Sequence, residues 1–296
     1  MLSELWDLVP RIPGWDASRS VNIRSLSHGT NSSYLVEFDN EARFVARVAG
    51  KGTAHLGIDR SIERDVIIAA YAAGLGFEPV LFELPQGHFI TRHVPGRPGT
   101  FDDCKDPTFM SRVATLLRQA HALDVPGVDA FDPYADIHQR LAHARSLGFP
   151  MPEGLAEVLE TLACVQARRA AMPDIEGLCH NDPWAPNFFI GDDGKFWLHD
   201  WEYAGRGDIF FDLAASAYFL DEPARRSFLN AYFGEAREAD LQSLRDMVFV
   251  NDLWNATWAL VKTATPEPGT DYAGIAHHHF AAASRFVAAE GLNQSF

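Results

Sequence analysis

The chain has 296 residues, of which 47% are hydrophobic and 12% aromatic, and a formal net charge of −15 at pH 7, which predicts a globular protein of one large domain or two modest ones. The negative charge argues against nucleic acids and anionic membranes as partners, because both attract basic surfaces. No apolar run reaches the ~18 residues of a membrane span, and no basic segment precedes an apolar run at the N-terminus, so we expect a cytoplasmic protein without a signal peptide or a membrane partner.

The first third of the chain has the pattern of an antiparallel sheet. After a helix-like opening, strands are predicted at 21–26, 33–38 and 43–48, where apolar and polar residues alternate. Small polar residues join the first two strands, and backbone N–H groups in such a turn can approach phosphate oxygens closely. Gly29, Asn31 and Ser32 are therefore candidate nucleotide-binding residues. A hairpin with a single glycine is also ordinary in proteins that bind no nucleotide, so this turn alone leaves both interpretations open.

Arg47 on the third strand and Glu63 in a helix predicted at 62–73 are candidates for a phosphate-binding ion pair. A guanidinium group offers phosphate a bidentate fork, and kinases hold such a cation in place with a helical glutamate. The alternatives are a solvent-facing arginine and a glutamate that interacts only with the helix dipole.

A change in composition predicts the domain organisation. A hairpin is expected at 79–94, residues 94–99 are expected to break regular structure, and helices are predicted at 109–122, 137–147 and 155–172. We therefore predict an N-terminal lobe at 1–94 and a C-terminal lobe at 95–296. Cys104, Cys164 and Cys179 have no metal or disulfide spacing, which indicates a reducing compartment, and the last two are predicted to be buried.

Polar residues gather around a second predicted hairpin, with strands at 187–190 and 195–198. Asp182 and Asn187 precede or begin the first strand, and Asp200 follows the second. Two carboxylates and an amide oxygen suit Mg²⁺, which prefers oxygen ligands. Their order matches the catalytic loop and the metal-binding aspartate of kinases, although aspartates also occur in turns for structural reasons alone.

Three motifs carry a family resemblance. They are His180-Asn181-Asp182 with Asn187, Asp200-Trp201-Glu202-Tyr203, and Phe211-Asp212-Leu213-Ala214. They resemble the aminoglycoside phosphotransferase and choline kinase superfamily, and the second motif is most similar to the choline/ethanolamine kinase branch, where phenylalanine commonly stands in place of Trp201. The resemblance implies an α+β, two-lobed protein-kinase-like fold, with an N-terminal antiparallel sheet and one helix, and a mostly helical C-terminal lobe with a catalytic hairpin. It would make residues 1–94 the nucleotide-binding lobe and residues 95–296 the catalytic and substrate-binding lobe.

The resemblance also implies roles for individual residues. Asp182 would be the catalytic base, and Asn187 and Asp200 the magnesium ligands. Residues aligned with Trp258 and Tyr272 line an aromatic cage for a cationic substrate in that branch, and Glu202 is a candidate for its anionic wall. Trp254 is a further cage candidate, but it departs by one residue from the family's spacing. Without the resemblance, Trp254 and Trp258 would be assigned to the core, and Glu202 to an exposed loop.

We therefore expect an enzyme that uses ATP and Mg²⁺ to phosphorylate the hydroxyl of a small amino alcohol, choline or ethanolamine. Three alternatives stay open: a kinase of another hydroxylated base or amino sugar, such as a thiamine-like or aminoglycoside-like compound; a metal-dependent phosphohydrolase that uses His180, His199 and Asp200; and a catalytically silent nucleotide-binding pseudokinase. The sequence leaves the oligomeric state open, a homodimer included.

Overall fold

The computed structural model describes residues 2–28, 31–39, 42–50, 57–172, 176–264, 266 and 269–293. The chain forms two compact units, and each is described by itself. The first comprises Met1–Asp129 with His180–Gly205, and the second comprises Ala130–Cys179 with Arg206–Phe296. These compact units have other bounds than the two lobes predicted from the sequence. The lobe boundary after residue 94 therefore stays a prediction.

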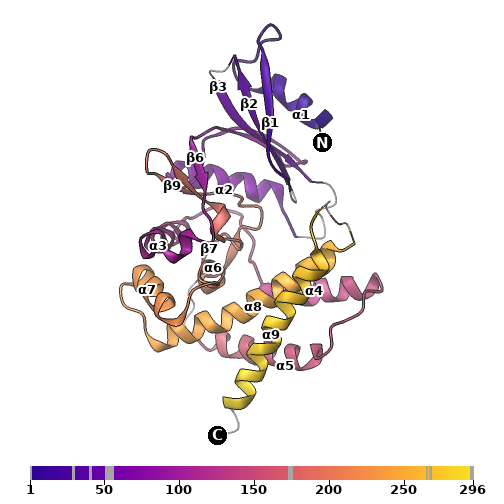
Figure 1. Cartoon of the computed structure of the whole chain (residues 1–296), viewed down its shortest axis with the longest axis vertical. Helices are drawn as coiled ribbons and strands as arrows, with labels where there is room; N and C mark the ends of the chain where they lie inside the picture. Colours follow the sequence, from indigo (N-terminus) through magenta and orange to yellow (C-terminus); the bar gives the residue numbers. More distant parts are fainter. Residues whose placement is uncertain are drawn as a thin grey trace. The chain divides into compact units, whose positions relative to one another are not determined.

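Within the described residues, the first unit contains a five-stranded antiparallel sheet (Figure 1). Its order is β1-β2-β3-β5-β4. The strands are β1 (Val21–His28), β2 (Asn31–Phe38), β3 (Ala42–Ala49), β4 (Pro79–Glu83) and β5 (His88–Arg92). The predicted N-terminal antiparallel sheet is thereby confirmed.

One face of this sheet is covered by the start of the chain. Side chains alternate between the two faces of a strand, and Val36 and Phe38 of β2 are buried on the covered face together with Phe44 of β3. The helix α1 (Leu2–Leu8) and the 3-10 turn η1 (Val9–Arg11) pack Leu5 and Leu8 against them. Each large side chain buried in this way contributes about 1.5–3 kcal/mol.

The helix α2 (Arg60–Ala72) begins two residues before its predicted start. The Asp59 carboxylate accepts hydrogen bonds from the backbone N–H groups of Ser61 and Ile62, and this N-cap adds Arg60 to the helix. Residues three apart on a helix are neighbours, and both Arg60 and Glu63 are buried. The helix therefore directs two opposite charges into the interior of the first unit.

A second sheet in the first unit contains the predicted catalytic hairpin. Its strands are β6 (Gly96–Pro98), β8 (Phe188–Gly191) and β9 (Phe196–Leu198), and β8 lies in the middle. The expectation of irregular structure at 94–99 is wrong for Gly96–Pro98. The backbone of β6 approaches β8 so closely that a Cβ at Gly96 would lie 2.3 Å from the Ile190 carbonyl oxygen, and a glycine therefore permits the pairing.

The end of β9 is fixed to the segment that follows α2. The backbone N–H of Leu198 donates to the carbonyl oxygen of Leu75 at 2.9 Å. The helix α3 (Pro107–His121) packs against β9, and the 3-10 turns η3 (Asp103–Lys105) and η4 (Ala185–Asn187) complete the first unit. The residues after β9 therefore start from an anchored strand end.

The second unit is helical, as predicted for the C-terminal part of the chain. Its long central helix α8 (Glu238–Lys262) contacts α4 (Pro133–Ser146), α6 (Ile209–Ser216) and α9 (Tyr272–Asn293) (Figure 1). The other elements are α5 (Leu155–Ala170), α7 (Glu222–Phe233) and the paired strands β7 (Glu176–Cys179) and β10 (Gly205–Asp208). Among the residues that the structure describes, none of the helices is long and apolar enough to cross a membrane.

The three cysteines differ in their accessibility, and this predicts their reactivity. All three are free thiols; Cys104 and Cys179 are buried, whereas Cys164 is exposed. The prediction that Cys164 is buried is wrong, because its neighbour Val165 takes the inward-facing position of α5. Burial raises the pKa of the Cys104 thiol to about 11, and burial also raises the pKa of Cys179. In the native protein, a thiol reagent at about pH 8 should therefore modify the exposed Cys164 rapidly and the two buried thiols slowly.

A Cys164→Ser variant is the control for this labelling experiment. It should lose the rapid phase and retain two thiols that react after denaturation. Rapid modification of the variant would contradict the assigned burial.

The buried ring of His88 predicts a pH dependence of stability. Its Nδ1 accepts a hydrogen bond from the Ala49 backbone N–H at 3.0 Å. Burial lowers the pKa of His88 below its ordinary 6.5, and the positive charges of Arg47 and Arg60 lower it further. The carboxylates of Glu83 and Glu4 oppose this shift. A histidine whose pKa is lowered by folding binds its proton more tightly in the unfolded chain. The unfolding free energy should therefore be highest above pH 6.5 and should fall as the pH drops through 6.5 toward the folded-state pKa.

Urea denaturation of the ligand-free protein at about pH 7.5 and about pH 5.5 measures this loss. His88→Asn offers a hydrogen-bond acceptor that does not titrate, so it should reduce the difference between the two pH values. An identical difference in the variant would contradict the role of His88.

Candidate active site

The loop 180–187, which carries Asp182, is held in place by the ring of His180. Nδ1 of this buried ring accepts a hydrogen bond from the backbone N–H of Asp182 at 3.2 Å. Nε2 lies 2.9 Å from the carbonyl oxygen of His199. The two contacts match a neutral imidazole that accepts at Nδ1 and donates at Nε2. Both ring nitrogens are therefore engaged, which fits a role in positioning the loop better than the metal chemistry of the phosphohydrolase alternative.

Asn187 also connects this loop to His199, the residue that directly follows β9. Its Nδ2 donates to the carbonyl oxygen of Asp182 at 2.7 Å and to Oδ2 of the Asp182 carboxylate at 3.2 Å. Its backbone carbonyl oxygen accepts from the N–H of His199 at 3.0 Å. Within the described part of the chain, Asn187 Oδ1 makes no hydrogen bond. The amide nitrogen thus orients Asp182, and the amide oxygen is available for a cation.

Asp200 follows these contacts along the chain and has an unusual backbone conformation. Its φ is +70°, in the left-handed region that few residues other than glycine adopt. Such a conformation persists where the surrounding structure enforces it, and it is common at functional sites. The side chain is 35% exposed, and its Oδ1 accepts a hydrogen bond from Nη1 of Arg47 at 2.9 Å. Asp200 is therefore a constrained carboxylate that solvent can reach.

Arg47 lies on β3 and is buried. Its Nη2 contacts Oε1 of Glu63 at 2.5 Å, so the expected ion pair is present. Its guanidinium lies 4.1 Å from the centroid of the Phe89 ring, a cation–π contact. Its Nε is buried and has no hydrogen-bond partner among the described residues. The phosphate-binding role of Arg47 stays a prediction.

Arg60 is a further member of this site, and no motif in the sequence pointed to it. Nη1 of Arg60 contacts Oε2 of Glu63 at 2.7 Å and Oε2 of Glu202 at 3.0 Å. The Glu202 oxygen also accepts from Nδ2 of Asn31 at 2.9 Å. A signal was available: Asp59 followed by Ser61 is typical of a helix N-cap, which would have extended the helix to Arg60 and placed it beside Glu63.

Glu202 is enclosed by these contacts. Burial raises the pKa of the Glu202 carboxyl above its ordinary value, the Asp200 carboxylate adds to the shift, and Arg47, Arg60 and Asn31 oppose it. Burial alone would lower the pKa of Arg60, but Glu63 and Glu202 together raise it. The carboxylate of Glu202 therefore faces an arginine within the first unit, and its predicted contact with a substrate cation stays a prediction.

Three carboxylates of this site lie close together. One oxygen from each of Glu63, Asp200 and Glu202 falls within 4.8 Å of the others, and Arg47 and Arg60 lie against them. The donors that best fit Mg²⁺ are the Asp200 carboxylate and Asn187 Oδ1, since both are oxygens of the kind that Mg²⁺ prefers. The residues present are therefore compatible with a magnesium ion. Such an ion would compete with Arg47 for the Asp200 carboxylate.

The three residues predicted in a nucleotide-binding turn were Gly29, Asn31 and Ser32. Gly29 lies outside the described residues. Asn31 and Ser32 lie within β2, because they pair with Ala49 and Val48 of β3, and the turn predicted at these two positions is wrong. Their nucleotide-binding role stays a prediction.

The aromatic candidates all lie in the second unit. Trp258 of α8 and Tyr272 of α9 form an edge-to-face pair with ring centroids 5.6 Å apart, and the Lys262 ammonium lies 5.4 Å from the Tyr272 centroid. Trp254 is buried: the Arg140 guanidinium lies 4.1 Å from its ring centroid, and its Nε1 donates to Asp136. The structure thus brings Trp258 and Tyr272 together, whereas Trp254 packs in the helical core.

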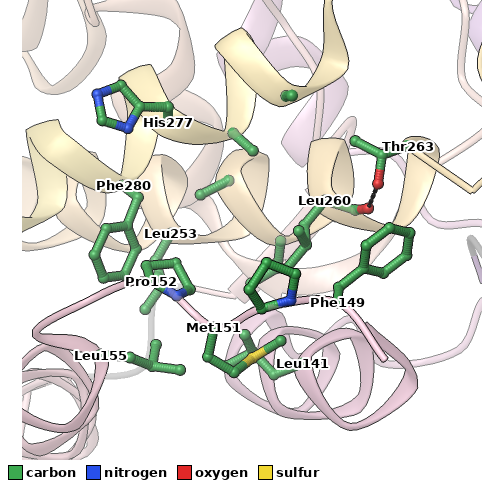
Figure 2. A pocket seen from close by; sticks show the side chains of 15 residues that line it. Leu141, Phe149, Met151, Pro152, Leu155, Leu253, Leu260, Thr263, His277 and Phe280 are labelled. Atoms are coloured by element: carbon green, nitrogen blue, oxygen red, sulfur yellow. Dashed lines mark hydrogen bonds between the residues drawn. The ribbon is translucent and has the colours of Figure 1, made fainter. Parts of the chain in front are cut away.

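A separate apolar cavity of about 490 Å³ also lies in the second unit. Figure 2 shows its walls, which come from the connection between α4 and α5 and from α8 and α9. Leu253, Leu260, Phe280 and Met151 are among the lining residues. None of the predicted site residues lines it in the described part of the chain.

Comparison with known proteins shows the family to which the chain belongs. Residues 22–247 match the phosphotransferase enzyme family (APH). Probable choline kinase 3 of Arabidopsis thaliana is 22% identical over 289 residues, which cover 85% of this chain and 82% of that protein. The predicted family resemblance is confirmed.

Two solved structures show the same fold. A choline/ethanolamine kinase family protein from Mesorhizobium loti has 24% sequence identity and a TM-score of 0.81, with 97% of this chain and 98% of that chain covered. LicA in complex with AMP has 20% identity and a TM-score of 0.78, with 97% and 96% covered. The predicted kinase-like α+β fold is thereby confirmed. The chain belongs to the phosphotransferase enzyme family and is a small-molecule kinase.

Proposed function

We propose that the chain transfers the γ-phosphoryl group of ATP to the hydroxyl of choline or ethanolamine. The observation that carries this proposal is the pair of links from the catalytic loop to the strand end before Asp200: His180 and Asn187 both bond to His199. They hold an acid-bearing loop beside a strand that ends in a second acid. Such an arrangement suits phosphoryl transfer, in which catalysis rests on positioning and charge stabilisation.

Asp182 accepts the proton of the substrate hydroxyl in this proposal. The hydroxyl oxygen then forms a bond to the γ-phosphorus, the bond between that phosphorus and the bridging oxygen breaks, and ADP leaves. The Asn187 amide donates to the Asp182 carboxylate and thereby orients it.

Asn187 Oδ1 and Asp200 would hold Mg²⁺. When bound, the ion would offset negative charge on the phosphates. Arg47 leaves Asp200 for the phosphate oxygens, and Glu63 keeps its guanidinium in place. Nucleotide binding is supported by the AMP complex of the structurally similar LicA.

The choice of substrate rests on two observations. The curated relative described above is named as a probable choline kinase. Trp258 is partly exposed and packs against Tyr272, which Lys262 already contacts, and aromatic rings of this kind attract an alkylammonium group. Trp254 takes no part in this proposal, because its ring already packs against Arg140.

ADP release with a panel of acceptors tests the proposed substrate. Choline, ethanolamine, thiamine and an amino sugar are each supplied with ATP and Mg²⁺, and a mixture without acceptor measures background hydrolysis. We expect turnover above background with choline or ethanolamine. Turnover with thiamine or the amino sugar, while both amino alcohols are inert, would contradict the substrate assignment.

A further inference from the structure

The charged cluster of the first unit has a buried part and an accessible end. The side-chain exposures are 7% for Arg47, 0% for Glu63, 8% for Arg60, 5% for Glu202 and 35% for Asp200. Replacing an ion-pair contact with water is costly where both groups are buried. Among these contacts, the one between Arg47 and Asp200 is therefore the most readily exchanged for a ligand.

The charges of the cluster do not balance. Three carboxylates face two guanidinium groups, which leaves an excess of one negative charge. Arg60 bridges Glu63 and Glu202, the two carboxylates that solvent scarcely reaches. Asp200 is the most exposed of the three carboxylates, so a cation can approach the cluster there.

The path of the Arg60 side chain is fixed by the turn between β4 and β5. A Cβ at Gly87 would lie 2.3 Å from Arg60 Cδ and 2.6 Å from its Nε, and the φ of Gly87 is +80°. The Gly87 carbonyl oxygen also accepts a weak hydrogen bond from Arg47 Nη2 at 3.4 Å. One turn therefore contacts both arginines, and its glycine leaves space for Arg60 to reach two carboxylates.

We propose that Arg60 is a positioning residue: by binding Glu63 and Glu202 together, it leaves Arg47 with Asp200 as the exchangeable contact that a magnesium-bound nucleotide replaces. This inference rests on the roles proposed above for Arg47 and Asp200. Without Arg60, the Glu202 carboxylate competes for Arg47 and draws it away from the phosphates. Arg60 itself touches neither nucleotide nor substrate in this scheme.

Four variants test the proposal by calorimetric titration with AMP-PNP, with Mg²⁺ and with EDTA. Arg60→Gln should weaken binding of the magnesium complex by about tenfold or more, with a smaller change in EDTA. Arg60→Gln combined with Glu202→Gln should recover most of the loss, because the competing carboxylate is gone. Arg60→Lys should fall between wild type and Arg60→Gln, because an ammonium keeps the charge but lacks the guanidinium fork. Arg64→Gln is the matched control, since Arg64 lies on the same helix and pairs with Asp65 at the surface.

Circular dichroism establishes which variants are folded. If Arg60→Gln does not fold, Arg60→Lys and the double variant still test the proposal. The proposal is overturned if a folded Arg60→Gln binds the magnesium complex as tightly as wild type, or if the double variant recovers nothing. An equal loss in Arg64→Gln would also overturn it, because any charge removed from α2 would then have the same effect. The proposed substrate is tested separately: a wild type that binds Mg²⁺ and AMP-PNP but phosphorylates neither amino alcohol contradicts the substrate and leaves the Arg60 result standing.

Discussion

Replacing Asp182 with asparagine should lower kcat by about 10²–10⁴-fold, the range that a general base contributes. The asparagine oxygen can still accept the hydrogen bond that Asn187 donates to Oδ2, so the loop should keep its conformation. The variant loses only the group that accepts the hydroxyl proton. Steady-state kinetics with varied ATP should therefore show a large fall in kcat and a KM for ATP within about threefold of wild type.

Asp192→Asn is the matched control for this substitution. Asp192 lies in the exposed turn between β8 and β9, and its replacement should leave kcat unchanged. Equal activity of wild type and Asp182→Asn would remove Asp182 from the chemistry. An equal fall in both variants would show that the hairpin tolerates no change of charge.

Replacing Arg47 with glutamine should lower the unfolding free energy by about 1–3 kcal/mol, because one oxygen of a buried carboxylate loses its partner. Glu63 is fully buried and would retain Arg60 as its cation. The same substitution should raise the KM for ATP, since the proposed phosphate contact is also lost. Urea denaturation measures the first effect, and steady-state kinetics measures the second.

Arg43→Gln is the control on the same strand. Arg43 pairs with Glu37, and its side chain is 49% exposed, so its loss should change the unfolding free energy by about 1 kcal/mol or less. A loss for Arg47→Gln no larger than that of the control would show that the buried cluster contributes little. A normal KM for ATP would contradict the phosphate role even if the protein were destabilised.

Local patterns in the sequence predicted much of the fold, because the relevant signals are short. Alternating apolar residues at Tyr34, Val36 and Phe38 identify a half-buried strand, and the glycine-rich turn after Ile190 identifies a hairpin. The strand at Gly96–Pro98 could not be predicted in this way. It exists because β8, almost a hundred residues later, provides the partner.

For Asp182, Asn187 and Asp200, residue type and order predicted functional roles that stay predictions, and the structure adds the hydrogen bonds that join their loop to the strand end before Asp200. The packing around Glu202 was not predictable, because its partners Arg60 and Asn31 come from distant parts of the sequence. The burial of Trp254 likewise depends on Arg140, Asp136 and other side chains that no local pattern connects to it. Long-range contacts thus decided how Glu202 and Trp254 are packed, and no local pattern predicts such contacts.

The ³¹P NMR spectrum of a reaction mixture tests the central claim most directly. Wild-type protein is incubated with ATP, Mg²⁺ and either ethanolamine or choline. We expect a new phosphomonoester resonance that grows as the γ-phosphate resonance of ATP decreases, with little inorganic phosphate. A spectrum in which only inorganic phosphate grows, or in which ATP persists with both amino alcohols, would contradict the claim.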